Sequence, residues 1–397
     1  MARHVSPPDS CAEDALLIRC ARMFAGSESL ERTSLLLPQV TNWPHVFNLA
    51  SRHGTTPLIS RLLLNTKWNA LPEPCAKELQ ASSRDRAARS LRLTAELLKV
   101  LEIFEHNSIP AVAFKGPALA ALLYGDITLR EFCDLDILIR REDVRRVKEV
   151  LLERGYKTDL PAGPAQEAAY LRARHELHFI SGDGCSIEIH QTFLAPFYCF
   201  PFDDEALWQR LEKKPFCGRE ILALAPEDLL LVLCAHATKH CWTRLAWICD
   251  MARLLVVAGA EIDFSRVMSR ASSLGAARMV LLGLFLAHQV LGAPVPSGIL
   301  NSAERDARAL RLARKVEASI FNREKIAPSE LESHRFFLQA RERWREKFLY
   351  CTRLAFMPTE EDHSALSLPS LLSPMYYPLH AVRVFGKYGL ASLKSFL

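Results

Sequence analysis

The spacing of apolar residues predicts that the N-terminal part of the chain is helical. Between residues 11 and 108, apolar positions recur every three or four residues, and Gly or Pro separates the segments. The last segment, Ala76 to Asn107, predicts one long amphipathic helix. Its inward stripe is expected to consist of Leu91, Leu93, Leu97, Leu98, Leu101 and Phe104.

After residue 108 the pattern changes to short apolar runs typical of strands. Four runs are expected to form strands, at residues 109–115, 133–140, 176–181 and 185–191. Helical spacing lies between them at residues 117–125 and 141–155, and Pro117 falls in a first helical turn, where no backbone donor is lost. The Gly-Asp-Gly sequence at 182–184 predicts a hairpin turn. We expect no other part of the chain to be rich in strands.

Helical spacing resumes at Pro226 and continues through a charged segment, followed by a Ser/Pro/Leu-rich loop and a basic amphipathic helix. The predicted fold class is therefore α+β, with a small mixed sheet embedded in a mainly helical chain. The expected regions are a helical N-terminal region (1–108), an α+β core (109–225), a helical region that closes the site (226–300) and a helical C-terminal region with the tail (301–397).

Composition limits the class of protein. The chain has 397 residues, 49% of them hydrophobic and 24% charged, which is enough to bury a large core without disulfides. Its eleven cysteines form no Cys-x-x-Cys pair and lie in apolar runs or at loop edges, a distribution typical of reduced thiols. A net charge of +5 is too small to indicate a nucleic-acid partner.

The sequence also lacks the patterns of an export signal and of a membrane span. The first residues contain Pro-Pro and acidic residues where a signal peptide needs an apolar stretch. No window reaches the roughly 18 apolar residues of a membrane span. We therefore expect a cytoplasmic protein without a transmembrane segment.

Two carboxylates interrupt the second predicted strand. Asp134 and Asp136 lie two residues apart, so both side chains are expected on one face of the sheet, where they would repel each other unless a cation lies between them. Glu188 lies between Ile187 and Ile189 in a later strand and is expected to point away from the core. If the two strands pair, three carboxylates converge, and such an oxygen-rich set suits Mg²⁺. A lone Asp-x-Asp is also found on solvated strand edges, so the metal site depends on its neighbours.

A predicted anion site lies just upstream of these carboxylates. The first strand runs through Lys115 into a turn at Gly116, and the N-terminus of the following helix offers free amides and a favourable dipole. Arg130 lies four residues before Asp134. A phosphate-binding turn followed by metal-binding carboxylates is the layout of phosphoryl or nucleotidyl transfer. The P-loop pattern is absent.

Three histidines lie in or next to the predicted hairpin. His190 follows Glu188 by two residues and is expected on the same face, where it would position substrate or a carboxylate, or be purely structural. His175 and His178 are expected to be structural.

A second pair of histidines lies on a predicted helix. His236 and His240 are four residues apart and share a face, next to Lys239. We expect them at the wall of the site, positioning substrate, with Lys239 reaching a phosphate. The alternatives are a zinc pair, for which further ligands do not stand out, and histidines that are packed or exposed.

The stretch that contains these residues resembles a known family. The run FKGPALAALLYGDITLREFCDLDILI, residues 114–139, is similar to the signature of bacterial nucleotidyltransferases of the DNA polymerase β superfamily. It looks like the branch with Lys-Gly, a Tyr about eight residues on, an Arg and Asp-x-Asp. The strand with Glu188 and His190 and the segment LCAHATKHCWTRLAWICDMARLL are also similar to that branch, and the resemblance covers most of residues 40–390.

The resemblance implies roles for four residues. Asp134, Asp136 and Glu188 would hold the metal and be catalytic, and Gly116 would lie against the triphosphate. The chain departs from the wider superfamily because Pro117 follows Gly116 where Ser or Gly is usual, and because 17 residues separate Gly116 from the first Asp. Pro117 removes one amide from the phosphate-binding turn.

The expected function is transfer of a nucleotidyl group from an NTP, with Mg²⁺ or Mn²⁺, to a hydroxyl or phosphate of a small biosynthetic or peptide acceptor. The same metal site would also serve a glycosyl or phosphoryl transferase. The third hypothesis is a nucleotide-binding protein without catalytic activity.

Overall fold

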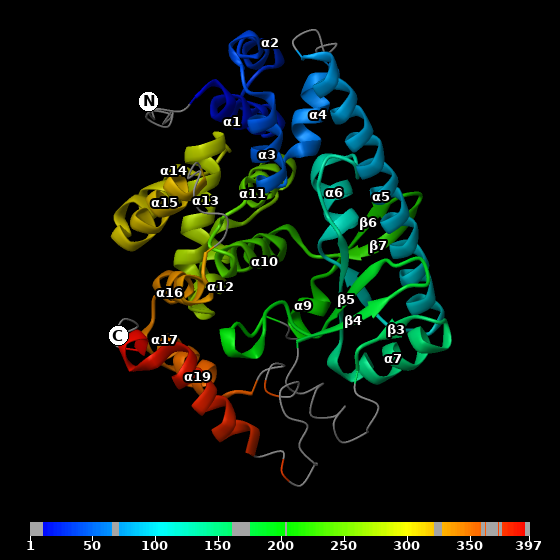
Figure 1. The fold of residues 1–397 in the computed structure, drawn as a ribbon. Coiled ribbons are helices and arrows are strands. Elements are labelled where there is room, and N and C mark those ends of the chain that lie inside the picture. Colours follow the sequence, from blue (N-terminus) through cyan, green and yellow to red (C-terminus); the bar gives the residue numbers. More distant parts are fainter. Residues whose placement is uncertain are drawn as a thin grey trace.

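The computed structural model describes residues 11–65, 71–160, 175–202, 205–320, 328–358, 362, 372 and 375–393. It is mainly helical with one small mixed sheet, which confirms the α+β fold class (Figure 1). The sequence expectations for the first ten residues, for most of the Ser/Pro/Leu-rich loop and for part of the charged helical segment lie outside the described residues.

The N-terminal part is helical as expected. Its elements are α1 (Ala12–Phe24), α2 (Leu30–Ser34), the 3₁₀ turn η1 (Leu37–Gln39), α3 (Trp43–His53), α4 (Thr56–Asn65) and α5 (Glu73–His106). The long helix α5 runs along one edge of the molecule (Figure 1). Leu93, Leu97 and Phe104 of its predicted stripe are buried, but Leu91 is 60% exposed. Leu91 precedes Leu93 by two residues, or about 200° of helical rotation, and therefore lies on the opposite face.

The sheet contains five strands in the order β1-β2-β5-β4-β3. Its elements and the helices between them are β1 (Ala111–Ala113), α6 (Gly116–Tyr124), β2 (Asp134–Ile139), η2 (Arg141–Asp143), α7 (Val144–Glu153), β3 (Lys157–Thr158), β4 (Glu176–Ile180) and β5 (Ser186–His190). β2 pairs with β5 in parallel and with β1 antiparallel, and β5, β4 and β3 form antiparallel pairs. The predicted hairpin at residues 182–184 is confirmed.

One face of the sheet belongs to an apolar core. Leu135, Ile137, Ile187 and Ile189 are fully buried, and they pack in one cluster with apolar residues of α5 and α7. Burying such an aliphatic side chain contributes about 1.5–3 kcal/mol. Since side chains alternate along a strand, this packing holds the residues between them on the opposite face.

A second small sheet was not expected from the sequence. η3 (Pro196–Tyr198) and α9 (Glu205–Gln209) lead to a hairpin of β6 (Glu212–Phe216) and β7 (Arg219–Ala223). Cys217 and Gly218 form its two-residue turn, and both have positive φ angles, the backbone that a tight hairpin requires. The expectation of a single strand-rich block was therefore wrong, because Cys-Gly is a weaker turn signal than Asn-Gly and the strand contains Pro215.

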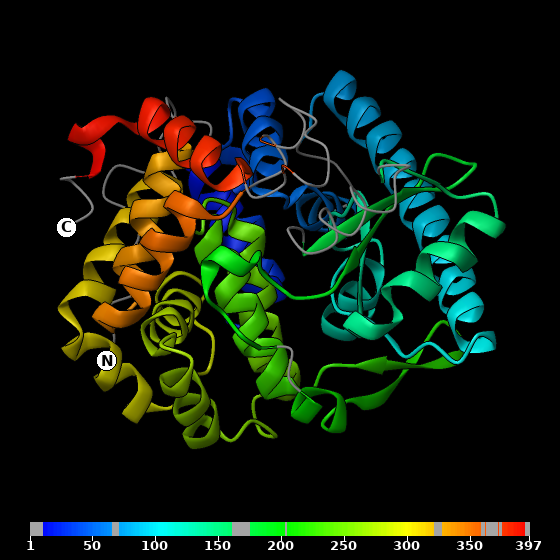
Figure 2. The same cartoon turned by 90° about the horizontal axis from the view of Figure 1, so that it is seen from below.

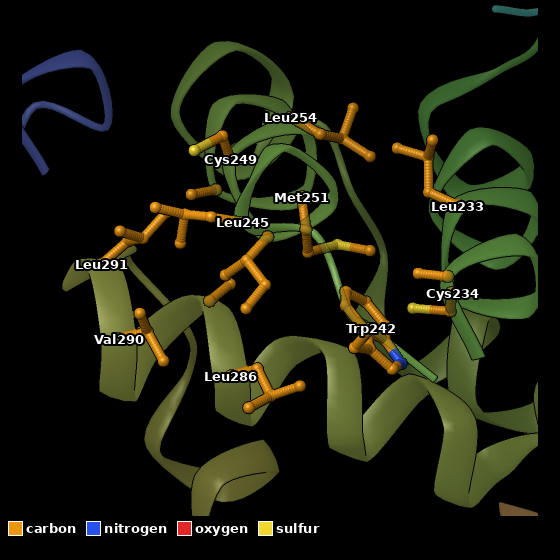
Figure 3. Close-up of a cluster of buried hydrophobic side chains, with 14 of the residues drawn as sticks. Leu233, Cys234, Trp242, Leu245, Cys249, Met251, Leu254, Leu286, Val290 and Leu291 are labelled. Atoms are coloured by element: carbon orange, nitrogen blue, oxygen red, sulfur yellow. The ribbon is translucent and has the colours of Figure 1, made fainter. Parts of the chain in front are cut away.

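A helical body packs beside the sheet. It contains α10 (Pro226–Lys239), α11 (Leu245–Ala258), α12 (Phe264–Ser273), α13 (Ala277–Leu291), α14 (Ser297–Arg305) and α15 (Ala307–Ile320). Figure 3 shows Trp242 and Cys234 packed between α10, α11 and α13. A Cβ atom at Gly283 of α13 would lie 2.7 Å from Cys234 Sγ and 2.9 Å from Trp242, so only glycine permits this approach.

The C-terminal helices continue this body on the side away from α5 (Figure 1, Figure 2). They are α16 (Glu330–Ala340), α17 (Trp344–Phe356) and α19 (Tyr376–Leu393), and α19 packs against α17. Arg341 is fully buried and donates hydrogen bonds to the carbonyl groups of Leu274, Gly275 and Tyr198, at 2.6, 3.1 and 2.8 Å. Within the described part of the chain, no helix has both the length and the apolar character needed to cross a membrane.

Candidate active site

The register of three strands gathers acidic residues on the polar face of the sheet. Asp136 of β2 lies directly beside Glu188 of β5. On the other side of β5, Glu188 faces His178 of β4, and His190 faces Glu176. Asp134, Asp136, Glu176 and Glu188 form what we call the acidic face. Asp134, Asp136 and Glu188 thus lie on one face, and the charges of Asp136 and Glu188 act on Asp134. Their role as metal ligands stays a prediction.

Asp136 is the most deeply buried member, with a side chain only 5% exposed. Its Oδ1 atom accepts a hydrogen bond from Lys115 Nζ at 2.8 Å and lies 3.1 Å from His190 Nε2. Burial alone would raise the pKa of Asp136, but the Lys115 ammonium and the His190 ring outweigh it and hold this pKa well below its ordinary value. The cation that the sequence required near the two aspartates is, in this structure, Lys115.

Asp134 has the opposite electrostatics. Burial, followed by the carboxylates of Asp136 and Glu188, raises the pKa of Asp134, and Lys115 compensates only in part. Asp136 and Glu188 therefore repel the charge of Asp134 by more than Lys115 compensates. Carboxylate oxygens on neighbouring strands with surplus negative charge fit a divalent cation such as Mg²⁺. Donor atoms of Asp136, Glu188 and His190 all lie within 4.8 Å of one another, which is close enough for one ion.

The turn at Gly116 brings the start of α6 against this face. Gly116 has a φ of +56°, and a Cβ atom there would lie 3.2 Å from the backbone oxygen of Asp134. Pro117 occupies the first turn of α6, as expected. The free amides of α6 therefore lie beside the beginning of β2, where a phosphate next to a bound cation would be located.

Three residues at this face, Glu176, His175 and His178, were not predicted to be functional. Glu176 Oε2 lies 3.0 Å from His175 Nε2, and Glu176 Oε1 lies 3.6 Å from His178 Nε2. Burial raises the pKa of Glu176, but the two histidines lower it by more than burial raises it. The net shift is therefore downward. The signal was present in the sequence, because the hairpin is symmetrical about Asp183 and this register places residues 176 and 178 opposite 190 and 188.

The C-terminal end of α10 faces the same site. Lys239 is half-buried, and burial lowers its pKa although Glu176, Glu188 and Asp136 act in the opposite direction. Burial and then Lys115 hold the pKa of His236 well below its ordinary value, while burial and then Lys239 lower that of His240 to about 3. Both histidines are therefore neutral near pH 7. The His236 and His240 rings are 4.8 Å apart, and His240 stacks on Trp247 at 5.4 Å.

Arg130 lies in a buried group that sequence reasoning did not identify. Its Nε atom donates to both oxygens of Asp250 on α11, at 3.1 and 3.0 Å. The Tyr124 hydroxyl donates to the same carboxylate at 2.9 Å. We call Tyr124, Arg130 and Asp250 the Asp250 group. It ties the end of α6 and the loop before β2 to the helical body, although Arg130 still lies within electrostatic range of Asp136.

A large solvent-open cavity lies elsewhere. It has a volume of about 630 Å³ and lies between the end of α5, the start of β1 and the β6–β7 hairpin. Its lining includes Glu105, Lys213 and Arg219 and none of the predicted site residues. The chemistry of the acidic face, rather than cavity size, therefore identifies the candidate site.

Comparison with known proteins gives a family assignment. Neither the curated proteins nor the solved structures contain a match to this chain. A family model described as uncharacterised nucleotidyltransferase matches residues 39–292. This match spans well over half of the chain and includes the turn at Gly116, the acidic face and the Asp250 group. The chain therefore belongs to this uncharacterised nucleotidyltransferase family.

Proposed function

We propose that the protein transfers a nucleotidyl group from an NTP to a hydroxyl or phosphate of a small biosynthetic or peptide acceptor. The observation that carries the proposal is the parallel pairing of β2 and β5, which sets Asp136 beside Glu188 on the face that also holds Asp134. Membership of a nucleotidyltransferase family supports an NTP as donor. We also assign the family to the DNA polymerase β superfamily, on the Lys-Gly turn and the Asp-x-Asp strand.

Asp134, Asp136 and Glu188 would hold the divalent cation, Mg²⁺ or Mn²⁺. Bound there, the cation would neutralise the phosphates and lower the pKa of an attacking hydroxyl. Glu188 would also accept the proton of the acceptor hydroxyl. It lies beside Asp136, and its Oε1 atom is 3.9 Å from His178 Nδ1.

The remaining roles concern the nucleotide and acceptor. Lys115 and the amides at Gly116 adjoin the carboxylates and would bind the triphosphate, together with Lys239 across the site. Arg130 would also bind the triphosphate, from its position beside Asp250. His190 would orient Asp136 through its Nε2 atom. His236 and His240 are neutral and would position the substrate by hydrogen bonds and ring contacts.

The first test is equilibrium binding of ATP, CTP, GTP, UTP and several sugar nucleotides, with and without Mg²⁺. We expect one NTP to bind in a Mg²⁺-dependent way and the Asp134→Asn protein to lose that dependence. Asp183→Asn is the matched control, because Asp183 is an exposed aspartate in the β4–β5 turn. Selective binding of a sugar nucleotide would favour glycosyl transfer, and equal loss in both variants would reject the metal site.

The second test identifies the group that is transferred. The preferred NTP is supplied labelled at either the α- or the γ-phosphate, with a pool of small-molecule and peptide acceptors. Nucleotidyl transfer moves the α-label to the acceptor and releases pyrophosphate. Movement of the γ-label would instead establish phosphoryl transfer, and binding without movement of either label would favour the non-catalytic reading.

A further inference from the structure

A second group of metal-ligating atoms lies beside the predicted Mg²⁺ ligands. His175 Nε2 lies 3.0 Å from Glu176 Oε2, and His190 Nδ1 lies 3.6 Å from that same oxygen. Ligand atoms of the three residues all lie within 4.8 Å of one another. Glu176 begins β4 and pairs with His190 at the end of β5, while His175 directly precedes β4 and its carbonyl accepts a hydrogen bond from Gln191 N at 2.7 Å.

His190 has a ring nitrogen that is aimed into this group and has no hydrogen-bond partner among the described residues. Its side chain is only 4% exposed, and the buried Nδ1 atom is the one without a partner. The other ring nitrogen, Nε2, faces Asp136 Oδ1 at 3.1 Å. A buried polar atom left without a partner costs free energy, so such an atom calls for a ligand.

The spacing and chemistry of the group fit a transition-metal ion. Nitrogen and oxygen ligands about 2.0–2.1 Å from a tetrahedral zinc ion lie roughly 3.3 Å apart, and the separations of 3.0 and 3.6 Å bracket this value. Two imidazoles and one carboxylate suit zinc, whereas Mg²⁺ favours oxygen ligands. Asp136 would hold the His190 ring from behind, because a ligating histidine usually gives its other N–H to a carboxylate.

We propose that His175, Glu176 and His190 bind one zinc-class divalent cation next to the carboxylates predicted to bind Mg²⁺. His190 separates the two sites, with Nδ1 directed to the first and Nε2 to Asp136 of the second. Three protein ligands leave one position open, as in catalytic zinc sites. Lys239 also faces the group, so an anionic oxygen in that position would be favourable. This site does not depend on the proposed transfer reaction.

The test uses tag-free full-length protein, stripped of metal, with Co²⁺ as the spectroscopic substitute for Zn²⁺. Mg²⁺ is added at millimolar concentration to occupy the carboxylates, and the titration is repeated without it and at a higher Mg²⁺ concentration. We expect one equivalent of Co²⁺ to give an intense visible d–d band of a four-coordinate site, and Zn²⁺ to displace it. His175→Gln is expected to weaken Co²⁺ binding by at least about 100-fold, because it removes one of three ligands.

The matched control is His178→Gln. His178 lies on the same strand and contacts Glu176 and Glu188, but it does not belong to the proposed ligand set. Circular dichroism checks that both variants fold. We expect His178→Gln and Asp134→Asn to keep the cobalt band, and Asp134→Asn to lose only the response to Mg²⁺. This separates failure of the zinc-class site from failure of the proposed function.

Three results would overturn the proposal. The first is equal weakening by His175→Gln and His178→Gln. The second is displacement of Co²⁺ by Mg²⁺, which would place the ion on the carboxylates. The third is a sulfur-to-cobalt charge-transfer band, which would place it at another described cluster, Cys11, Asp14 and His45.

Discussion

The acidic face and the Asp250 group each contain a buried carboxylate bound to a cation, yet they differ in what surrounds the pair. The Asp136 side chain is 5% exposed and Lys115 15%, while Asp250 is 1% exposed and Arg130 12%. Burial is therefore similar. Asp250 receives Arg130 and the Tyr124 hydroxyl, so both of its oxygens accept hydrogen bonds, and burial rather than a neighbouring carboxylate raises its pKa.

At the acidic face the same balance is missing. Asp134 and Glu188 add negative charge beside the Lys115–Asp136 pair, and within the described part of the chain His190 Nδ1 has no hydrogen-bond partner. The comparison teaches that burial of an ion pair does not by itself distinguish a site from a structural link. Repulsion between carboxylates together with an unpartnered ring nitrogen distinguishes it, because such groups gather at sites where something else binds.

The largest expected effect is on activity and concerns the acidic face. Asp134→Asn should reduce Mg²⁺-dependent transfer by at least about 1,000-fold, because it would remove one of the carboxylates that we propose hold the cation. The free energy of unfolding should not fall, since the lost carboxylate has repulsive neighbours. Steady-state kinetics and urea denaturation measure the two quantities. Loss of stability together with activity would erase the contrast with the Asp250 group.

The next effect is on stability and concerns Asp250. Asp250→Asn should lower the free energy of unfolding by about 3 kcal/mol, because Arg130 would remain buried without its counter-ion. Tyr124→Phe is the milder control, costing about 1 kcal/mol for one hydrogen bond. Urea denaturation gives both values. A variant of normal stability that no longer binds NTP would instead assign Arg130 directly to the triphosphate, as the sequence predicts.

Helix α6 begins at Gly116 beside the acidic face and ends at Tyr124 of the Asp250 group, and a change at Gly116 should show an intermediate effect. Gly116→Ala places a Cβ in the left-handed region, which costs about 1–2 kcal/mol, and sets it 3.2 Å from the Asp134 carbonyl. Gly125→Ala is the matched control at the other end of α6, with a φ of +68° and nothing within 4 Å of its Cβ. Both variants carry the cost of a positive φ angle, but only Gly116→Ala also crowds β2. The difference between them in unfolding free energy and in NTP affinity therefore measures the effect of this crowding. Identical behaviour would show that this approach is unimportant.

The sequence was sufficient for much of the acidic face because strand periodicity is local. Alternation places Asp134 with Asp136, and apolar neighbours direct Glu188 away from the core, so only the pairing of β2 with β5 had to be assumed. The positions of Glu176 and His178 beside His190 and Glu188 could have been predicted from the same hairpin register. They were missed because the turn was used to predict a hairpin and not to align its residues.

The Asp250 group could not have been predicted from spacing. Arg130 and Asp250 are 120 residues apart, and nothing in the local pattern distinguishes a buried aspartate in a helix from an exposed one. Arg130 was assigned to phosphate because it lies just before Asp134, and that role stays a prediction. The division into regions at residues 108, 225 and 300 also stays a prediction, since helices of several regions share one core.

The smallest effect is the pH dependence of stability, and it tests the surplus charge directly. Because the folded-state pKa of Asp134 is raised above its ordinary 3.8, the folded protein binds this proton more tightly than the unfolded chain does. Stability should therefore fall as pH rises from about 3.8 through the raised pKa, and Asp134→Asn should lack this fall. In EDTA near pH 7 the variant should be more stable by about 0.5 kcal/mol, and the difference should vanish at low pH.

Mg²⁺ provides the decisive control for this last prediction. If the repulsion at Asp134 exists because a cation normally relieves it, Mg²⁺ should stabilise the wild-type protein and reverse the order of the two proteins near pH 7. Urea denaturation across pH, with EDTA or Mg²⁺, measures both effects. A wild-type protein that is more stable than Asp134→Asn in EDTA would mean that the acidic face is as well balanced as the Asp250 group, and the contrast between them would fail.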